Sequence, residues 1–71
     1  MKTVVIPYKD QRNAVGEAIT MSYWCKDMGL IREKDYDWTF KSNEKEICFR
    51  FYGEDESYAS LFALKWAGRE I

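Results

Sequence analysis

The sequence predicts a small two-layer α+β domain in which both helices cover one face of a three-stranded, mainly antiparallel sheet. Two stretches alternate apolar and polar residues as strands do, and two others repeat apolar residues at helical spacing. The predicted element order is β-α-β-β-α. A length of 71 residues leaves room for one domain, residues 1–71. Three tryptophans, five tyrosines and four phenylalanines supply the core that so short a chain needs.

The first strand and the first helix are predicted within residues 3–28. Residues 3–8 are rich in β-branched side chains and include Pro7 near their end, which is typical of a short strand. Asp10 is a suitable N-cap for a helix that runs to about Met28, and Gly29 can supply the left-handed residue that follows. We expect this helix to bury one side, made of Ala14, Ala18, Met21, Cys25 and Met28 and extended by Val15 and Ile19.

Two residues of this helix need a separate interpretation. Trp24 lies at the edge of the predicted buried side, where a position in the core is favoured, but such a ring is also suited to anchor a partner. Gly16 costs helix stability relative to alanine. We therefore expect it to mark a close approach by the sheet or by the second helix.

The clearest pattern is that of a β-hairpin around residues 42–45, where apolar and polar side chains alternate on both sides of the turn. A turn centred on Asn43 and Glu44 aligns the aromatic face. On the other face it aligns two pairs of opposite charge, each worth ~0.2–1 kcal/mol. The predicted cross-strand pairs are Phe40 with Ile47, Trp38 with Phe49, Tyr36 with Phe51, Lys41 with Glu46 and Asp37 with Arg50. Because Glu44 lacks the tolerance of glycine for positive φ, a longer loop is the alternative.

The order of the strands has two solutions. With the first strand beside the third, the sheet is an antiparallel split β-α-β arrangement, and we favour this order. With the first strand beside the second, these two strands are parallel and are joined by a right-handed crossover. In both solutions the helices cover the aromatic face of the hairpin.

The segment after Gly53 predicts a second helix that is apolar almost all the way round. Acidic residues suit the start of a helix, and Asp55 or Ser57 can cap it. On a helical wheel one arc contains Tyr58, Ala59, Phe62, Ala63, Trp66 and Ala67, and Leu61, Leu64 and Ile71 lie roughly opposite. A surface helix should carry polar residues on that second side. The second side is therefore either a further part of the core or a contact surface.

Charge and composition argue against nucleic-acid binding and membrane insertion. Eleven Lys and Arg are interspersed with twelve Asp and Glu, so the basic stripe of a duplex-binding domain is missing. The alternative class, nucleic-acid association, requires a patch assembled in space from Lys2, Lys9, Arg12, Lys26 and Arg50. No segment is apolar for long enough to serve as a signal peptide or a membrane span. Two cysteines make no disulfide framework, so we expect a reduced, cytoplasmic location. Because the chain runs from Met1 to Ile71 without a tag or linker, we expect a complete small gene product.

The chain has no histidine, the commonest general base and metal ligand, so we expect no enzymatic activity, no cofactor and no metal. A third class is a metal- or thiol-dependent activity. Cys48 projects from the charged face of the hairpin, and a thiol-dependent activity requires it to be accessible there. Glu54, Asp55 and Glu56 would supply half of a hard-cation site. The structural roles, a small strand residue and acids at a helix N-terminus, are favoured.

We therefore expect a small non-enzymatic protein-interaction module that either closes a homodimer or docks on a larger protein partner. The residues predicted to bind the partner are Leu61, Leu64, Lys65 and Ile71 on the last helix, Glu54, Asp55 and Glu56 before it, and Trp24. For Leu61 and Leu64 a core position is an equal alternative. In size and composition the chain resembles small accessory proteins of tailed phages, including inhibitors of host enzymes or defence systems. This likeness assigns a role to no residue.

Overall fold

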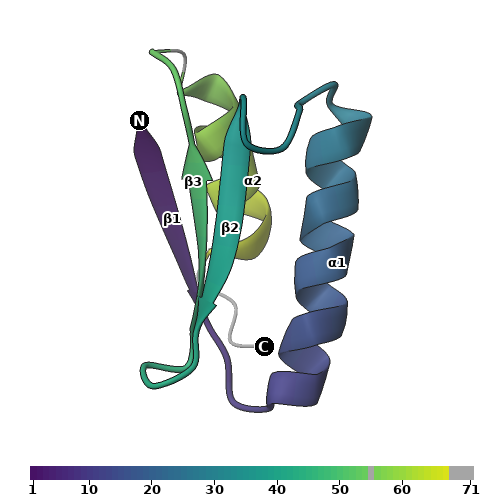
Figure 1. Ribbon diagram of the computed structural model, residues 1–71, viewed down its shortest axis with the longest axis vertical. Coiled ribbons are helices and arrows are strands. Elements are labelled where there is room, and N and C mark those ends of the chain that lie inside the picture. Colours follow the sequence, from purple (N-terminus) through teal and green to yellow (C-terminus); the bar gives the residue numbers. More distant parts are fainter. Residues whose placement is uncertain (55, 68–71) are drawn as a thin grey trace.

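The computed structural model describes residues 1–54 and 56–67, and these residues form five elements in the predicted order. They are β1 (Lys2–Pro7), α1 (Gln11–Asp27), β2 (Tyr36–Lys41), β3 (Glu46–Phe51) and α2 (Ser57–Trp66), shown in Figure 1. The first strand begins and ends one residue earlier than the predicted residues 3–8. Tyr8 lies just beyond it, where its side chain is buried and its N–H donates to the Lys45 carbonyl at 2.9 Å.

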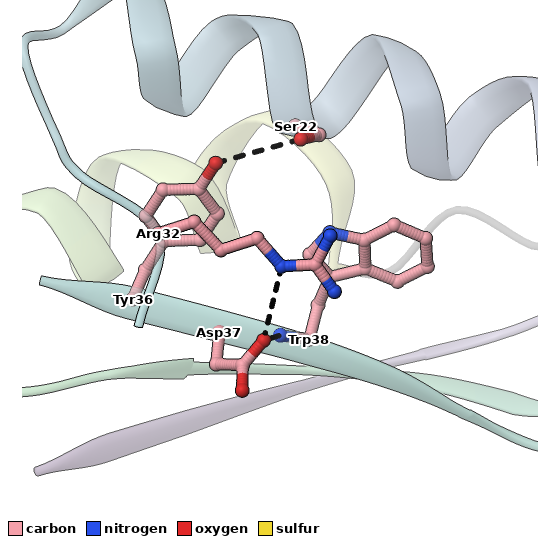
Figure 2. Close-up of polar contacts among 5 residues, drawn as sticks. All are labelled: Ser22, Arg32, Tyr36, Asp37 and Trp38. Carbon is pink, nitrogen blue, oxygen red and sulfur yellow. Dashed lines mark hydrogen bonds and ion pairs between the residues drawn. The ribbon is translucent and has the colours of Figure 1, made fainter. Parts of the chain in front are cut away.

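The sheet is antiparallel throughout, with strand order β1-β3-β2, which confirms the favoured arrangement. Both helices lie on the same side of it (Figure 2). Phe62 of α2 contacts Phe49 of β3 with ring centroids 4.6 Å apart, and Ser22 of α1 lies within 3.4 Å of the Tyr36 hydroxyl of β2. Phe49 and Tyr36 belong to one face of the sheet, so the domain has two layers as predicted.

The hairpin has the predicted register, including the facing positions of Asp37 with Arg50 and of Lys41 with Glu46. The turn is closed by the Glu44 N–H, which donates to the Lys41 carbonyl at 3.1 Å. Lys45 adopts the positive φ of 54° that this loop needs, and Glu44 does not. The absence of glycine from the turn is therefore compatible with a tight four-residue loop.

Both ends of α1 are formed as predicted. The Asp10 carboxylate accepts a hydrogen bond from the Arg12 N–H at 3.0 Å and so caps the N-terminus. At the other end Gly29 has φ of 84°, its N–H donates to the Lys26 carbonyl, and the Leu30 N–H donates to the Cys25 carbonyl. This pair of bonds is a Schellman motif, which requires a left-handed residue at position 29.

The buried side of α1 is narrower than expected. Ala14, Ala18, Met21 and Cys25 are buried, as predicted. The prediction was wrong for Val15, Ile19 and Met28, which are 43% to 46% exposed. A helix that lies on a three-stranded sheet buries one stripe, and these residues lie on its flanks.

The expectation for Gly16 was also wrong. A Cβ atom at this position would meet nothing within 4 Å, so neither the sheet nor α2 approaches Gly16 closely. The residue lies in the exposed part of α1.

The second helix is short. It begins at Ser57, and Glu56 occupies the N-cap position without a side-chain hydrogen bond, so the predicted capping by Ser57 was wrong. Asp55, the other predicted cap, lies outside the described residues. The helix ends at Trp66, and Ala67 adopts an extended conformation with φ of −66° and ψ of 139°.

The core is a cluster of aromatic rings between the sheet and the two helices. Phe49 at the centre of β3 stacks on Trp38 at 5.7 Å between ring centroids, and it also contacts Phe62. Phe62 in turn contacts Phe51 at 5.2 Å and Trp66 at 4.7 Å. These rings link both layers, so the domain depends on them for its hydrophobic stabilisation.

Candidate functional site

The exposed side of α2 carries two leucines. Leu64 is 84% exposed and Leu61 is 49% exposed, whereas Ala59, Phe62 and Trp66 of the same helix are buried. The two leucines are three residues apart and therefore neighbours on the helix surface. The structure thus places both residues on the surface and assigns neither to the buried core.

The predicted polar residues lie around these leucines. Lys65 is exposed and holds its ammonium group 5.2 Å from the centroid of the Trp66 ring. Glu54 and Glu56 are exposed at the N-terminal end of the helix. We call Leu61, Leu64, Lys65, Glu54 and Glu56 the α2 surface. Asp55 and Ile71, which were predicted to belong to it, lie outside the described residues.

Trp24 occupies the core position that was favoured for it. Its ring makes edge-on contacts with Phe62, at 5.8 Å between centroids, and with Trp66, at 5.6 Å. The ring therefore joins α1 to the buried side of α2 and is not part of the α2 surface. Its contribution is to hold the two helices together.

The two cysteines are free thiols and both are buried. A thiol-dependent activity requires an accessible Cys48, but only 3% of this residue is exposed. In the central strand, its register places it between Val5 and Thr39, so a small side chain is covered by its neighbours even on the open face of the sheet. Burial also raises the pKa of the Cys25 thiol to about 12, which keeps this thiol protonated and unreactive.

Three observations bear on the other functional classes. Within residues 1–54 and 56–67, no three Cys, Asp or Glu side chains gather closely enough to hold a metal ion. None of the helices in this part of the chain is sufficiently long and apolar to cross a bilayer. Lys2 pairs with Phe51 and Arg50 pairs with Thr3, so these two bases of the conceivable basic patch lie on opposite faces of the sheet.

A groove that the sequence did not indicate lies between the C-terminal half of α1 and the connection to β2. Its volume is about 460 Å³. Apolar walls come from Tyr23, Leu30 and Ile31, and two of these are prominently exposed, Tyr23 at 62% and Ile31 at 57%. Lys26 and Arg32 add positive charge to the lining.

The connection that forms one wall of the groove is held by local hydrogen bonds. The Asp35 carboxylate accepts from the Ile31 N–H at 2.8 Å, and the Asp35 N–H donates to the Ile31 carbonyl at 2.7 Å. The Glu33 N–H donates to the Tyr36 carbonyl at 2.6 Å, and the Tyr52 N–H donates to the Asp35 carbonyl at 2.9 Å. The wall is therefore preformed by the fold.

Arg32 lies between α1 and β2, where it covers Trp38 (Figure 2). Its Nε is 3.2 Å from Asp37 Oδ1, and its guanidinium carbon is 5.1 Å from the centroid of the Trp38 ring. The same carboxylate oxygen accepts the Trp38 N–H at 2.8 Å. The Trp38 N–H, followed by Arg32 and Arg50, lowers the pKa of Asp37. Asp37 therefore pairs directly with Arg32, although the register of the hairpin places Arg50 opposite it.

Comparisons with models of known protein families, with curated proteins and with solved structures found no match to this chain.

Sequence reasoning missed the groove for a definable reason. Residues 30–35 have no period of a helix or a strand, so they predicted only a connection. Tyr23 and Ile31 lie on either side of Gly29, but only the structure shows that both side chains stay exposed and that Gly29 is left-handed. Exposure, which decides whether such residues form a surface, depends on contacts between elements.

Proposed function

We propose that this protein is a small non-enzymatic interaction module that acts through the α2 surface, and that the first partner of this surface is a second copy of the chain. The observation that carries the proposal is the 84% exposure of Leu64 beside the half-exposed Leu61. Neighbouring exposed apolar side chains on one helix face are a frequent feature of protein contact sites.

The arrangement of charge supports a symmetric dimer. Two α2 helices that cross antiparallel near Leu61 bring the leucines of both copies together, as a self-complementary interface requires. Lys65 of each copy then lies toward the N-terminal end of the other helix, next to its Glu56. The opposite charges and the antiparallel helix dipoles both favour this orientation.

We also propose that the protein acts in a reducing compartment such as the cytoplasm. Support comes from Cys25 and Cys48, which are free and lie on opposite faces of the sheet layer. A larger protein that the α2 surface binds and modulates is the alternative to the second copy. It would recognise the same two leucines.

An NMR dilution series tests the proposed contact. Amide signals of α2 should move with protein concentration in the wild-type protein and should stop moving in Leu64→Glu. Val15→Glu is the matched control, because it places the same charge at an exposed apolar position of α1, and it should retain the wild-type behaviour.

Two outcomes would count against the proposal. Concentration-independent signals in the wild-type protein would exclude the second copy and leave a larger protein as the occupant to be sought. Loss of signal dispersion in Leu64→Glu at all concentrations would show that Leu64 contributes to the fold, and the α2 surface would then lose its main residue.

A further inference from the structure

We propose that the groove between α1 and the connection to β2 binds a small organic anion with an apolar, preferably aromatic, body. The groove is lined by residues of α1, the connection and β2, and no described residue of α2 lines it. The inference is therefore independent of the proposed function of the α2 surface.

The size and the walls of the groove suit a small molecule. Its volume of about 460 Å³ falls within the range of roughly 300–1,000 Å³ that is usual for small-molecule sites. Tyr23 projects from the helix and Ile31 from the facing connection, and both remain largely exposed in the protein alone. A flat apolar body between them would remove their surface from water, which is the main source of affinity in such sites.

The charge of the groove selects an anion. Lys26 and Arg32 line it, and none of the described lining residues is acidic. Arg32 already bonds Asp37 through Nε. Lys26, in contrast, makes no ion pair within residues 1–54 and 56–67, so its ammonium group is available to a carboxylate or a phosphate.

Two hydroxyl groups add polar contacts to the lining. Ser22 Oγ on α1 and the Tyr36 hydroxyl on β2 lie 3.4 Å apart, and both residues line the groove (Figure 2). A hydroxyl group can donate as well as accept, so each can bond an anionic oxygen. A few polar groups that converge in a mainly apolar groove are typical of small-molecule sites.

The groove is already formed in the protein without a ligand. The Schellman motif at Gly29 fixes one end of the connection, and the Asp35 carboxylate fixes Ile31 through its backbone N–H. A preformed site avoids the entropic cost of ordering a loop, which favours binding of even a small ligand.

The test is an NMR titration of the full chain with 4-phenylbutyrate, followed through the backbone amide signals. We expect saturable shifts confined to residues 22–36. The neutral 4-phenylbutanamide has the same body and should bind at least about fivefold more weakly, as expected for the loss of one charge contact. Butyrate, which lacks the ring, should cause no saturable shift.

Two pairs of variants locate the site. Lys26→Gln should weaken binding of 4-phenylbutyrate by about fivefold or more. Lys34→Gln removes a positive charge from the nearby connection to β2, outside the described lining of the groove, and should bind like wild type. Tyr23→Ala should weaken the acid and the amide alike, whereas Val15→Ala, another exposed apolar position of α1, should change neither.

Three results would overturn the inference. The first is no saturation of the shifts up to about 10 mM, a concentration at which even a millimolar site would be mostly filled. The second is equal binding of the acid and the amide, which would show that the groove recognises only the apolar body of the ligand and not its charge. The third is unchanged affinity in both Lys26→Gln and Tyr23→Ala, which would place the ligand elsewhere.

Discussion

At the scale of single residues, burial decides which side chains can react with molecules in solution. Cys48 lies on the face of the sheet that no helix covers, but it is only 3% exposed because it sits in the central strand between larger neighbours. Cys25 is fully buried on the side of α1 that faces the sheet, and burial raises its pKa to about 12. A thiol that is buried and protonated is a packing residue and a poor nucleophile.

Both thiols should therefore resist modification in the folded protein. With a thiol-specific reagent at about pH 8, we expect no labelling of the native protein on the timescale on which the urea-unfolded chain takes up two labels. Mass spectrometry counts the labels, and digestion locates them. Rapid labelling of Cys48 in the native protein would show that its side chain is accessible.

Replacement of Gly16 should stabilise the protein, because neither the packing nor the backbone conformation at this position requires glycine. An added Cβ meets no atom within 4 Å, and the residue lies inside α1. Gly16→Ala should raise the free energy of unfolding by about 0.5–1 kcal/mol, measured by urea denaturation. Gly29→Ala is the contrasting variant and should destabilise, because position 29 has φ of 84°. A destabilised Gly16→Ala would reveal a role for this glycine in the fold.

Truncation of Phe49 and truncation of Leu64 should have very different effects on the free energy of unfolding. Phe49 is fully buried and packs against rings from both layers, so Phe49→Ala should cost about 3–5 kcal/mol and unfold much of the protein. Leu64→Ala should change the free energy of unfolding of the monomer by less than about 0.5 kcal/mol, because Leu64 is exposed. Urea denaturation at low protein concentration measures both. Similar costs for the two variants would contradict the assignment of Leu64 to the surface.

At the scale of elements, Asp37 at the start of β2 holds the connection between α1 and β2 in place through its contact with Arg32. This carboxylate accepts the Trp38 N–H and bonds Arg32, and these contacts lower its pKa below the ordinary value of 3.8. Since the folded-state pKa is depressed, the stabilisation is present above the unfolded-state pKa and is lost as pH falls through the folded-state value.

Asp37→Asn should therefore flatten the acid dependence of stability. The wild-type protein should lose more free energy of unfolding between neutral pH and about pH 2 than the variant does, as measured by urea midpoints. Asp27→Asn is the control, because this exposed aspartate at the end of α1 shows no such bonds in the described part of the chain. It should retain the wild-type acid dependence. Equal slopes for wild type and Asp37→Asn would remove the stabilising role of these contacts.

The elements differ in how far the sequence predicts them. The hairpin register was predictable because the period of two and the pairing of Lys41 with Glu46 and Asp37 with Arg50 agree on one alignment. The ends of α1 were predictable because Asp10 and Gly29 act locally.

Exposure was less predictable because it depends on contacts between elements. Val15 and Ile19 continue the apolar pattern of α1, but both lie beside its buried stripe and remain exposed. Arg32 and Asp37 are five residues apart on different segments, and only the folded connection brings them together. For the candidate site, the sequence indicated Leu61 and Leu64 but could not decide between core and surface, and it gave no sign of the groove.

At the scale of the whole molecule, one aromatic core joins two layers and leaves two distinct surfaces. The α2 surface combines exposed leucines with Lys65 and acidic residues, whereas the groove combines apolar walls with basic residues. The formal net charge of the chain is −1, so repulsion between copies is weak and does not oppose association. The proposed contact with a second copy would use the α2 surface and leave the groove open.

The most direct test of this account is the mass of the wild-type protein in solution, measured by light scattering over a wide range of concentrations at moderate salt. The account predicts a rise from the monomer mass of 8.5 kDa toward twice that value as concentration increases, and no such rise for Leu64→Glu. A constant mass of 8.5 kDa for the wild-type protein across the whole range would contradict self-association through α2.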